Sequence, residues 1–359
     1  MVRFIASLVA IAGGCALLFA WWLWAEVPQS EDYTLLFEDE RLTRFSEHCA
    51  AEVFLEELPA LETGAVLHSA VVFLGHGEVS PSQGWPDDPR PSWDCRPADL
   101  PRHWRLNQQV EFQALAPDGK PLERSFDPEL LPDDPMEPRA RRCAKGQLTA
   151  GGFKQAVLAG RRLVARYGEA LAEATLEVLS LPQRPCLATA AGALLPLLPG
   201  FTRGTVSITT LASGTFADVP DADAFRESED LMARWCHEGT LPCSQQGCLT
   251  PAHVAAKVNA ADAELCAEVK LARWLQTATS KSRLTLLSLG VAEMAQVFRA
   301  VRKRCERPAL GSLLVLERWA RNASAARWRV LWNGLDISEN LCPGEQMGCD
   351  EGLVLDRLG

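Results

Sequence analysis

The stretch AVLHSAVVFLGHG, residues 65–77, decides the fold. Its first ten residues are mostly apolar, as expected for a strand that is buried on both faces of a sheet. Gly75 and Gly77 follow at once with His76 between them, so the strand leads directly into a tight loop. Ligands bind beyond the carboxyl ends of the strands in open α/β sheets. The segment therefore predicts an α/β domain with a candidate site at His76.

Helices and strands alternate after this first strand. Residues 146–168, GQLTAGGFKQAVLAGRRLVARYG, place apolar side chains at helical spacing and offer Thr149 as an N-cap. A strand is predicted at Thr175–Leu181, and a helix is predicted at Cys186–Leu198. Further strands are predicted at Arg283–Ser288, Ser312–Trp319 and Trp328–Leu331. This alternation favours a three-layer α/β core with helices on both faces of the sheet.

Two segments depart from the alternation. Residues 82–140 are dense in proline and aspartate, which predicts an irregular surface loop inserted into the domain. Residues 205–280 have a mainly helical pattern that is interrupted by cysteines, and Ala255–Trp274 is rich in alanine. We expect this second segment to form a helical cap on the core.

The N-terminus carries a membrane-spanning pattern. Phe4–Ala25 contains no charged side chain and is long enough to cross a bilayer core of roughly 30 Å as a helix. A cleaved signal peptide is the alternative, but the apolar part of a signal peptide is usually ~7–15 residues long. Leu23, Trp24 and Ala25 also make a poor cleavage site. We therefore expect an uncleaved signal anchor.

The flanking charges predict the orientation of this anchor. Arg3 precedes it, and acidic residues follow it, so the positive-inside tendency places residues 1–3 in the cytosol. An acidic stem is then expected at residues 26–62 and a lumenal domain at residues 63–359. The sequence thus predicts a single-pass type II protein of a secretory membrane.

Cysteine usage agrees with a lumenal domain. Of the 12 cysteines, all but Cys15 follow the anchor, where disulfides are expected in an oxidising compartment. Cys236, Cys243 and Cys248 do not have the spacing of a zinc site, so we expect disulfides and no metal there. The odd number beyond the anchor leaves one thiol free or paired between chains. Asn322 begins a glycosylation sequon, which is relevant if this part is lumenal.

The overall charge excludes one class of partner. The net charge is −10 and the pI is near 5.2, whereas a nucleic-acid-binding domain normally carries a clustered basic surface. We therefore expect no nucleic-acid partner.

Four motifs together resemble the histidine acid phosphatase family. They are VVFLGHGEVSP at 71–81, the helix motif at 146–168, SLPQRPCLATAAGALLPLLPG at 180–200 and LTLLSLGVAEM at 284–294. Within the family, LMARWCHEGTLPCSQQGCLTPAHV at 231–254 and RWRVLWNGLDI at 327–337 resemble the 2-phosphoxylose phosphatase branch. The resemblance covers roughly residues 65–345. It implies a phosphoglycerate-mutase-like α/β core, no cofactor and no metal.

The resemblance assigns roles to residues at the first two motifs. His76 falls at the position of the nucleophile that attacks phosphorus, and Arg184 falls at that of a phosphate-binding arginine. Gly75 and Val79 stand where the family has two further arginines, and Glu78 adds a negative charge beside the expected phosphate. Most of the positive charge that would hold a phosphate is therefore missing.

In the family, a distal histidine and aspartate together support protonation of the leaving oxygen. At the fourth motif the resemblance places Gly290 at this histidine and Val291 at this aspartate. Because some relatives have a glutamate nearby, Glu293 is a candidate substitute acid. A second alternative is that His103 or His237 folds into the pocket. Loss of a general acid costs roughly 10²–10⁴-fold in rate.

These losses lead to the expected function. We expect a Golgi-anchored, 2-phosphoxylose-phosphatase-like pseudophosphatase that is linked to glycosaminoglycan-linker processing and that binds a phosphorylated glycan or a glycan-processing enzyme. One alternative is an active phosphomonoesterase that uses His76 as a phosphohistidine nucleophile. The other is a structural or interaction protein of the secretory pathway.

Overall fold

The chain divides into two units, Met1–Phe45 and Ser46–Gly359, and the computed structural model describes residues of the second. Described are Cys49, Ala51, Val53, 65–82, Trp93, Cys95, 110–122, Cys143, 146–171, 175–198, 204–212, 215–216, 222–238, 243–244, 247–249, eight positions between 257 and 278, 283–303, 307–320, 326–345 and 348–358.

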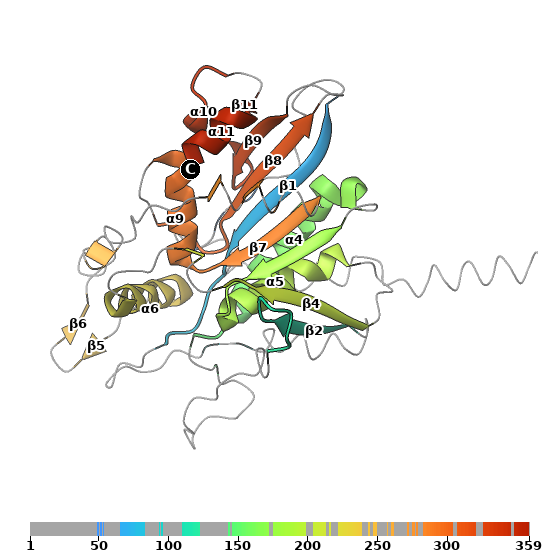
Figure 1. Cartoon of the computed structure of the whole chain (residues 1–359). Helices are drawn as coiled ribbons and strands as arrows, with labels where there is room; N and C mark the ends of the chain where they lie inside the picture. The colour runs from blue at the N-terminus through green and yellow to red at the C-terminus, as the bar shows by residue number, and fades with distance from the viewer. Residues whose placement is uncertain are drawn as a thin grey trace, which may run out of the picture. The chain divides into compact units, whose positions relative to one another are not determined.

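A single twisted sheet forms the centre of the described residues (Figure 1). Its strands run in the order β10-β9-β8-β1-β7-β3-β4-β2, and β11 pairs with β9. Their bounds are β1 Val66–Gly75, β2 Val110–Leu115, β3 Leu176–Ser180, β4 Gly204–Thr210, β7 Leu284–Leu289, β8 Leu313–Ala320, β9 Arg327–Trp332, β10 Leu335–Asp336 and β11 Cys349–Asp350.

Helices flank the sheet, and a separate small hairpin follows one of them. The helices are α4 Ala150–Leu171, α5 Arg184–Leu194, α6 Ala222–Glu238, α9 Val291–Arg302, α10 Ser338–Leu341 and α11 Glu351–Leu358, with the 3₁₀-helix η5 at Leu195–Leu197. The hairpin pairs β5 Cys243–Ser244 with β6 Gly247–Cys248.

The central strand β1 is buried on both faces, as its sequence predicts. Val72 and Leu74 pack into the core cluster that includes α4 and α5 residues such as Leu163 and Leu187. Val71 and Phe73 point to the opposite face and pack with residues of α9, α10 and α11. Because side chains alternate along a strand, one apolar run supplies both cores. The result is the expected three-layer α/β arrangement (Figure 1).

The direction of the strands places the candidate site. β1 runs parallel to β7, which in turn runs parallel to β3, whereas β8 is antiparallel to β1. The register pairs Gly75 with Leu289, so His76 and Gly290 follow neighbouring positions at the same edge of the sheet. The parallel strands therefore end together where His76 begins its loop.

Close backbone packing explains the glycines of α4. A Cβ at Gly160 would lie 2.1 Å from the Ala193 carbonyl oxygen, so only glycine lets α4 approach the end of α5 this closely. A Cβ at Gly152 would lie 2.2 Å from the Glu78 carbonyl oxygen. Thr149 caps the helix as predicted, because its Oγ1 accepts the Gly152 N–H at 3.1 Å. The first turn of α4 thus rests against the loop that follows His76.

The sequence prediction was wrong in three places. Val110–Leu115 of the expected loop insertion 82–140 forms strand β2 at the sheet edge, parallel to β4. Gly204–Thr210, at the start of the expected cap 205–280, is strand β4 of the central sheet. In the expected stem 26–62, Cys49 and Val53 are buried. Long-range pairing or burial overrides a local composition rich in proline or charge at β2 and in the stem, whereas the Thr, Val and Ile residues of Gly204–Thr210 favour a strand by themselves.

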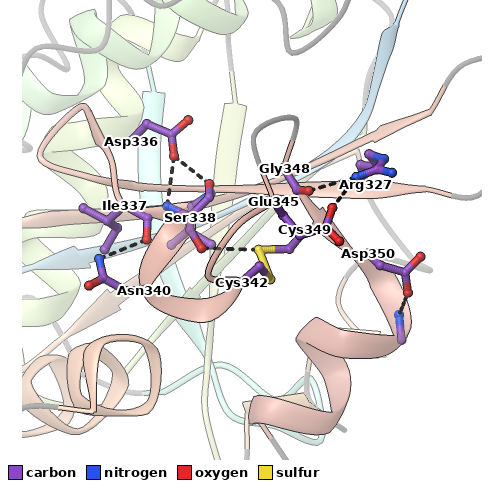
Figure 2. Close-up of a disulfide and its surroundings, with 12 residues drawn as sticks. Arg327, Asp336, Ile337, Ser338, Asn340, Cys342, Glu345, Gly348, Cys349 and Asp350 are labelled. Atoms are coloured by element: carbon purple, nitrogen blue, oxygen red, sulfur yellow. Dashed lines mark hydrogen bonds and ion pairs between the residues drawn. A yellow bond between two sulfur atoms is a disulfide. The ribbon is translucent and has the colours of Figure 1, made fainter.

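Three disulfides join described cysteines, which confirms the expectation of disulfides. Cys49 pairs with Cys236, Cys95 with Cys143 and Cys342 with Cys349. Among described cysteines outside disulfides, Cys186 is buried as a free thiol. Cys236 is thus in a disulfide and not in a zinc site, and no cluster of potential metal ligands occurs in the described part of the chain. Figure 2 shows the Cys342–Cys349 disulfide beside Ser338 and Arg327.

Several predictions fall on residues that the structure does not describe. They are the tail 1–3, the signal anchor 4–25, most of the stem 26–62, Asn322 and His103. Within the described ranges, no helix has both the length and the apolar character needed to cross a bilayer.

Candidate functional site around His76

His76 is fixed at the carboxyl end of β1 in a defined tautomer. The residue is 5% exposed, and its backbone N–H donates to the Leu289 carbonyl at 3.0 Å. Its ring Nδ1 lies 2.8 Å from the Gly77 carbonyl oxygen, and because that oxygen can only accept, Nδ1 carries the proton. The lone pair of the neutral ring is therefore on Nε2.

Burial favours this neutral form. Desolvation lowers the pKa of His76 below its ordinary value, although the Gly77 carbonyl and the charge of Glu293 act in the opposite direction. At neutral pH His76 thus offers an unprotonated Nε2, the state that a nucleophile or a general base requires.

A small pocket that is open to solvent lies beside His76. It is bounded by loop and helix residues from four parts of the chain, namely His76, Val79, Glu229, Met232, Ala233, Val291, Arg307, Pro308 and Leu310. The charged side chains in this lining are Glu229 and Arg307. The lining is otherwise mostly apolar, so these two groups dominate the electrostatics of the pocket.

Glu229 of α6 is the acidic group that faces the imidazole. Its Oε1 lies 3.9 Å from His76 Nε2, and its side chain is 25% exposed. Burial raises the pKa of Glu229 to about 7, and the neighbouring charge of Asp230 adds to this shift, while Arg307 and Arg226 oppose it. Glu229 is therefore close to half protonated at neutral pH.

Glu293 lies at the first turn of α9 and occupies the space above Gly290. A Cβ at Gly290 would lie 2.4 Å from Glu293 Oε2, so the carboxylate fills the volume that a side chain at 290 would need. Burial raises the pKa of Glu293, and Glu229 adds to the shift, although backbone N–H groups and His76 oppose it. Glu293 thus couples electrostatically to His76, but it is not among the residues that line the pocket, and its role as a substitute acid stays a prediction.

The positions assigned by the family resemblance are brought together in part. Val79 and Val291 both line the pocket beside His76. Arg184 begins α5 and is not among the lining residues. Gly75 is buried, but a Cβ there would make only ordinary contacts, the nearest 3.5 Å from the Ser312 carbonyl oxygen. The backbone therefore does not require glycine at position 75.

The contacts of Glu78 differ from the expectation that its negative charge lies beside the phosphate. Its carboxylate accepts a hydrogen bond from Thr149 Oγ1 at 2.6 Å and lies 2.8 Å from His237 Nδ1, which can donate to it. His237 in turn stacks on Trp93 with the ring centroids 4.0 Å apart. Neither Glu78 nor His237 lines the pocket. Glu78 thus stabilises the junction of the His76 loop, α4 and α6, and the hypothesis that His237 serves as a pocket histidine was wrong.

This junction gives a prediction for stability. Glu78→Gln keeps an oxygen for Thr149 but removes the charge that pairs with His237, so we expect the free energy of unfolding to fall by about 1–2 kcal/mol. Urea denaturation at neutral pH measures it. The matched control is Glu227→Gln in α6, whose ion pair with Lys257 is half exposed and should be worth under ~1 kcal/mol. Equal losses in both variants would contradict a stabilising role for Glu78.

The sequence did not point to Glu229 or Arg307. Glu229 lies two residues before the motif at 231–254, in an amphipathic helix where acidic side chains are usually solvated. Arg307 precedes a proline and reaches the pocket while donating to Ser228 Oγ of α6 at 2.6 Å. The docking of α6 against the loop of His76 brings Glu229 to 3.9 Å from the imidazole, and Arg307, which donates to Ser228 of α6, lines the same pocket.

Comparison with known proteins yields likeness of fold and no match of sequence. No protein-family model matches the chain, and no curated protein is significantly similar to it. A phytase of Klebsiella sp. ASR1 is 15% identical, covering 82% of this chain and 95% of its own, with a TM-score of 0.49. A phytase from D. castellii is 12% identical, covering 87% and 84%, with a TM-score of 0.46.

A Bifidobacterium longum multiple inositol polyphosphate phosphatase, solved with inositol hexasulfate, is also similar. It is 10% identical, covering 81% of this chain and 92% of its own, with a TM-score of 0.37. These structural neighbours are histidine acid phosphatases, and each is a distant likeness of overall fold.

Proposed function

We propose that this protein is a catalytically impaired, histidine-acid-phosphatase-like domain that keeps the His76 pocket as a binding site. By the resemblance of its motifs to the 2-phosphoxylose phosphatase branch, its setting is the processing of phosphorylated glycans such as the glycosaminoglycan linker. The segment 4–25 would anchor it in a Golgi or other secretory membrane, with the described domain in the lumen.

The observation that carries this proposal is the lining of the pocket. The family motif has an arginine at the position of Val79 and an aspartate at that of Val291, and both valines line the pocket beside His76. Each charge-assisted hydrogen bond from arginine to phosphate is worth about 1.5–3 kcal/mol. Valine side chains at these two positions can neither donate hydrogen bonds to a phosphate nor support protonation of the leaving oxygen.

The carboxyl groups add to this deficit. A phosphate bound at His76 Nε2 would face Glu229, which lies 3.9 Å from that nitrogen, with Glu293 coupled to the same imidazole. Arg307 alone provides a positive charge in the described lining of the pocket. Because like charges repel each other strongly at this distance in a partly desolvated pocket, a dianion is poorly held at neutral pH.

A second candidate, an active phosphomonoesterase, is favoured by one observation. The Nδ1 proton of His76 is held by the Gly77 carbonyl, which leaves Nε2 unprotonated and directed toward the pocket lining. This is the tautomer that attacks phosphorus. In this reading Glu293 or Glu229 donates the proton to the leaving oxygen.

A turnover assay separates the two candidates. The full chain, produced in a secretory host, is incubated with a phosphoxylose-containing linker and with a generic phosphomonoester, beside the His76→Ala variant. We expect wild type to release phosphate no faster than His76→Ala on both substrates. A wild-type rate at least ~10²-fold above His76→Ala would establish the phosphatase and refute the impaired domain.

A further inference from the structure

The carboxyl group of Glu229 lies next to the imidazole of His76 in the pocket. Its Oε1 lies 3.9 Å from His76 Nε2, and both residues line the same cavity. Any ligand atom in contact with Nε2 therefore lies within a few ångströms of this carboxyl. Because α6 carries Glu229 and the His76 loop follows β1, the docking of α6 decides this contact.

The docking of α6 is held by polar contacts on both sides of Glu229. Asp230 accepts hydrogen bonds from the backbone N–H of Ser82 at 2.7 Å and from its Oγ at 2.9 Å. Ser228 accepts one from Arg307 at 2.6 Å. The disulfide between Cys49 and Cys236 adds a covalent tie near the end of the helix. Glu229 is therefore held in place at the pocket and is not a mobile surface side chain.

Charged and titratable groups surround Glu229 on every side that packs against it. They are His76 after β1, Cys186 of α5, Glu293 of α9, Arg307, and Asp230 and Arg226 of α6 itself. Burial keeps the pKa of the Cys186 thiol well above its ordinary value and that of His76 below its ordinary value, so both are neutral near pH 7. The charge of the pocket near pH 7 is then decided by the carboxyl groups against Arg307.

We propose that Glu229 is a specificity-determining residue of the pocket, which Arg307 also lines: as a carboxylate it excludes an oxyanion from the space beside His76, and as a neutral acid it admits one and donates a hydrogen bond to it. This rests on the proposed function in one respect, namely that the pocket still binds a ligand. Anion binding is then conditional on uptake of one proton.

The direction of the pH dependence follows. The pKa of Glu229 is raised to about 7, so the neutral acid predominates below that pH and the carboxylate above it. Anion affinity is therefore highest on the acid side and is lost as the pH rises through about 7. The pKa of His76 is lowered by burial, so its titration lies on the acid side of its ordinary value, and the Glu229→Gln variant described below separates the contribution of Glu229 from that of His76.

Sulfate is a suitable probe because it remains a dianion throughout this range. Titration calorimetry of the full chain with sulfate at about pH 5.5 and about pH 8.5 should show binding at least ~10-fold tighter at the lower pH. Glu229→Gln, which cannot ionise, should bind more tightly than wild type at the higher pH and show less than ~3-fold difference between the two. Glu229→Met is a second uncharged variant in case the glutamine variant does not fold.

Glu227→Gln is the matched control, because it removes a carboxylate from the same helix at a half-exposed position paired with Lys257. It should keep the wild-type pH dependence. The inference is overturned if wild type binds sulfate equally at both pH values, if Glu229→Gln keeps the wild-type ratio, or if neither protein binds sulfate at the lower pH. None of these results affects the turnover assay, whose outcome alone decides whether the domain is catalytically impaired.

Discussion

Replacing Cys49 and Cys236 together by serine is expected to lower the free energy of unfolding by about 4–5 kcal/mol. The cysteines are 187 residues apart in sequence, and the entropy that a cross-link removes from the unfolded chain grows with the length of the closed loop. For a domain whose total stability is typically ~5–15 kcal/mol, this is a large fraction. Thermal or urea unfolding of the oxidised variant measures it.

The native contacts around this disulfide add to the expected loss. Ala51 donates its backbone N–H to the Leu310 carbonyl at 3.0 Å, and Val53 packs in the core with α4 and α5. Leu310 lines the His76 pocket. Without the disulfide, the described residues Cys49, Ala51 and Val53 keep these contacts and the hydrogen bond from Gln155 Nε2 to the Cys49 carbonyl at 3.5 Å. We therefore expect the pocket to be disturbed together with the stability.

The Cys342–Cys349 disulfide is the matched control (Figure 2). Its cysteines are 7 residues apart, and it lies by α10 and β11, so its double serine variant should lose about 2–3 kcal/mol. A loss in the Cys49/Cys236 variant no greater than in this control would contradict a dominant role of the long-range cross-link.

Replacing Glu317 by alanine is expected to cost about 3–5 kcal/mol of unfolding free energy. Glu317 of β8 has no exposed surface and accepts hydrogen bonds from Arg166 Nε at 2.6 Å, Tyr167 OH at 2.7 Å and Trp319 Nε1 at 2.9 Å. Arg329 Nη1 lies 3.6 Å from Glu317 Oε2, the oxygen that also accepts from Trp319. Removing the carboxylate leaves these donors without their shared acceptor in a buried layer between α4 and β8.

Two controls test this reading. Glu345→Ala removes a carboxylate whose ion pair with Arg327 is exposed, and it should cost under ~1 kcal/mol. Glu317→Gln keeps one acceptor oxygen and should lie between the two. Urea denaturation at neutral pH measures all three variants. If Glu317→Ala is no more destabilised than Glu345→Ala, the buried network does not stabilise the fold.

The sequence predicted the parts of the fold that depend on short-range pattern. The apolar run of β1, the helix α4 with its Thr149 cap, and the strands β3, β7, β8 and β9 were all predicted to within a few residues. The helix α4 forms its own backbone hydrogen bonds, and each strand carries an apolar run or alternation that fits a buried sheet, so the pattern of every one of these segments is visible locally. The strand β2 was missed because an edge strand within a proline-rich segment is specified by its partner β4.

The candidate site was likewise predicted only in part from the sequence. The motif around His76 was visible in the sequence, and Val79 and Val291, which the family resemblance singled out, both line the pocket. The prediction that Glu78 places a negative charge beside the bound phosphate was wrong, because its carboxylate binds Thr149 and His237. A glutamate next to a motif histidine does not reveal in sequence which way its side chain points.

By itself the sequence determined the buried strand, the helices around it and the single imidazole at the strand end, because these follow from residue spacing within one segment. Only the tertiary structure decided what faces that imidazole. Glu229 and Arg307 are more than 150 residues from His76 in sequence and line its pocket in the folded chain, Glu229 because α6 docks on the loop after β1. The electrostatics of the site arise from that docking, since charges interact through space and not along the chain.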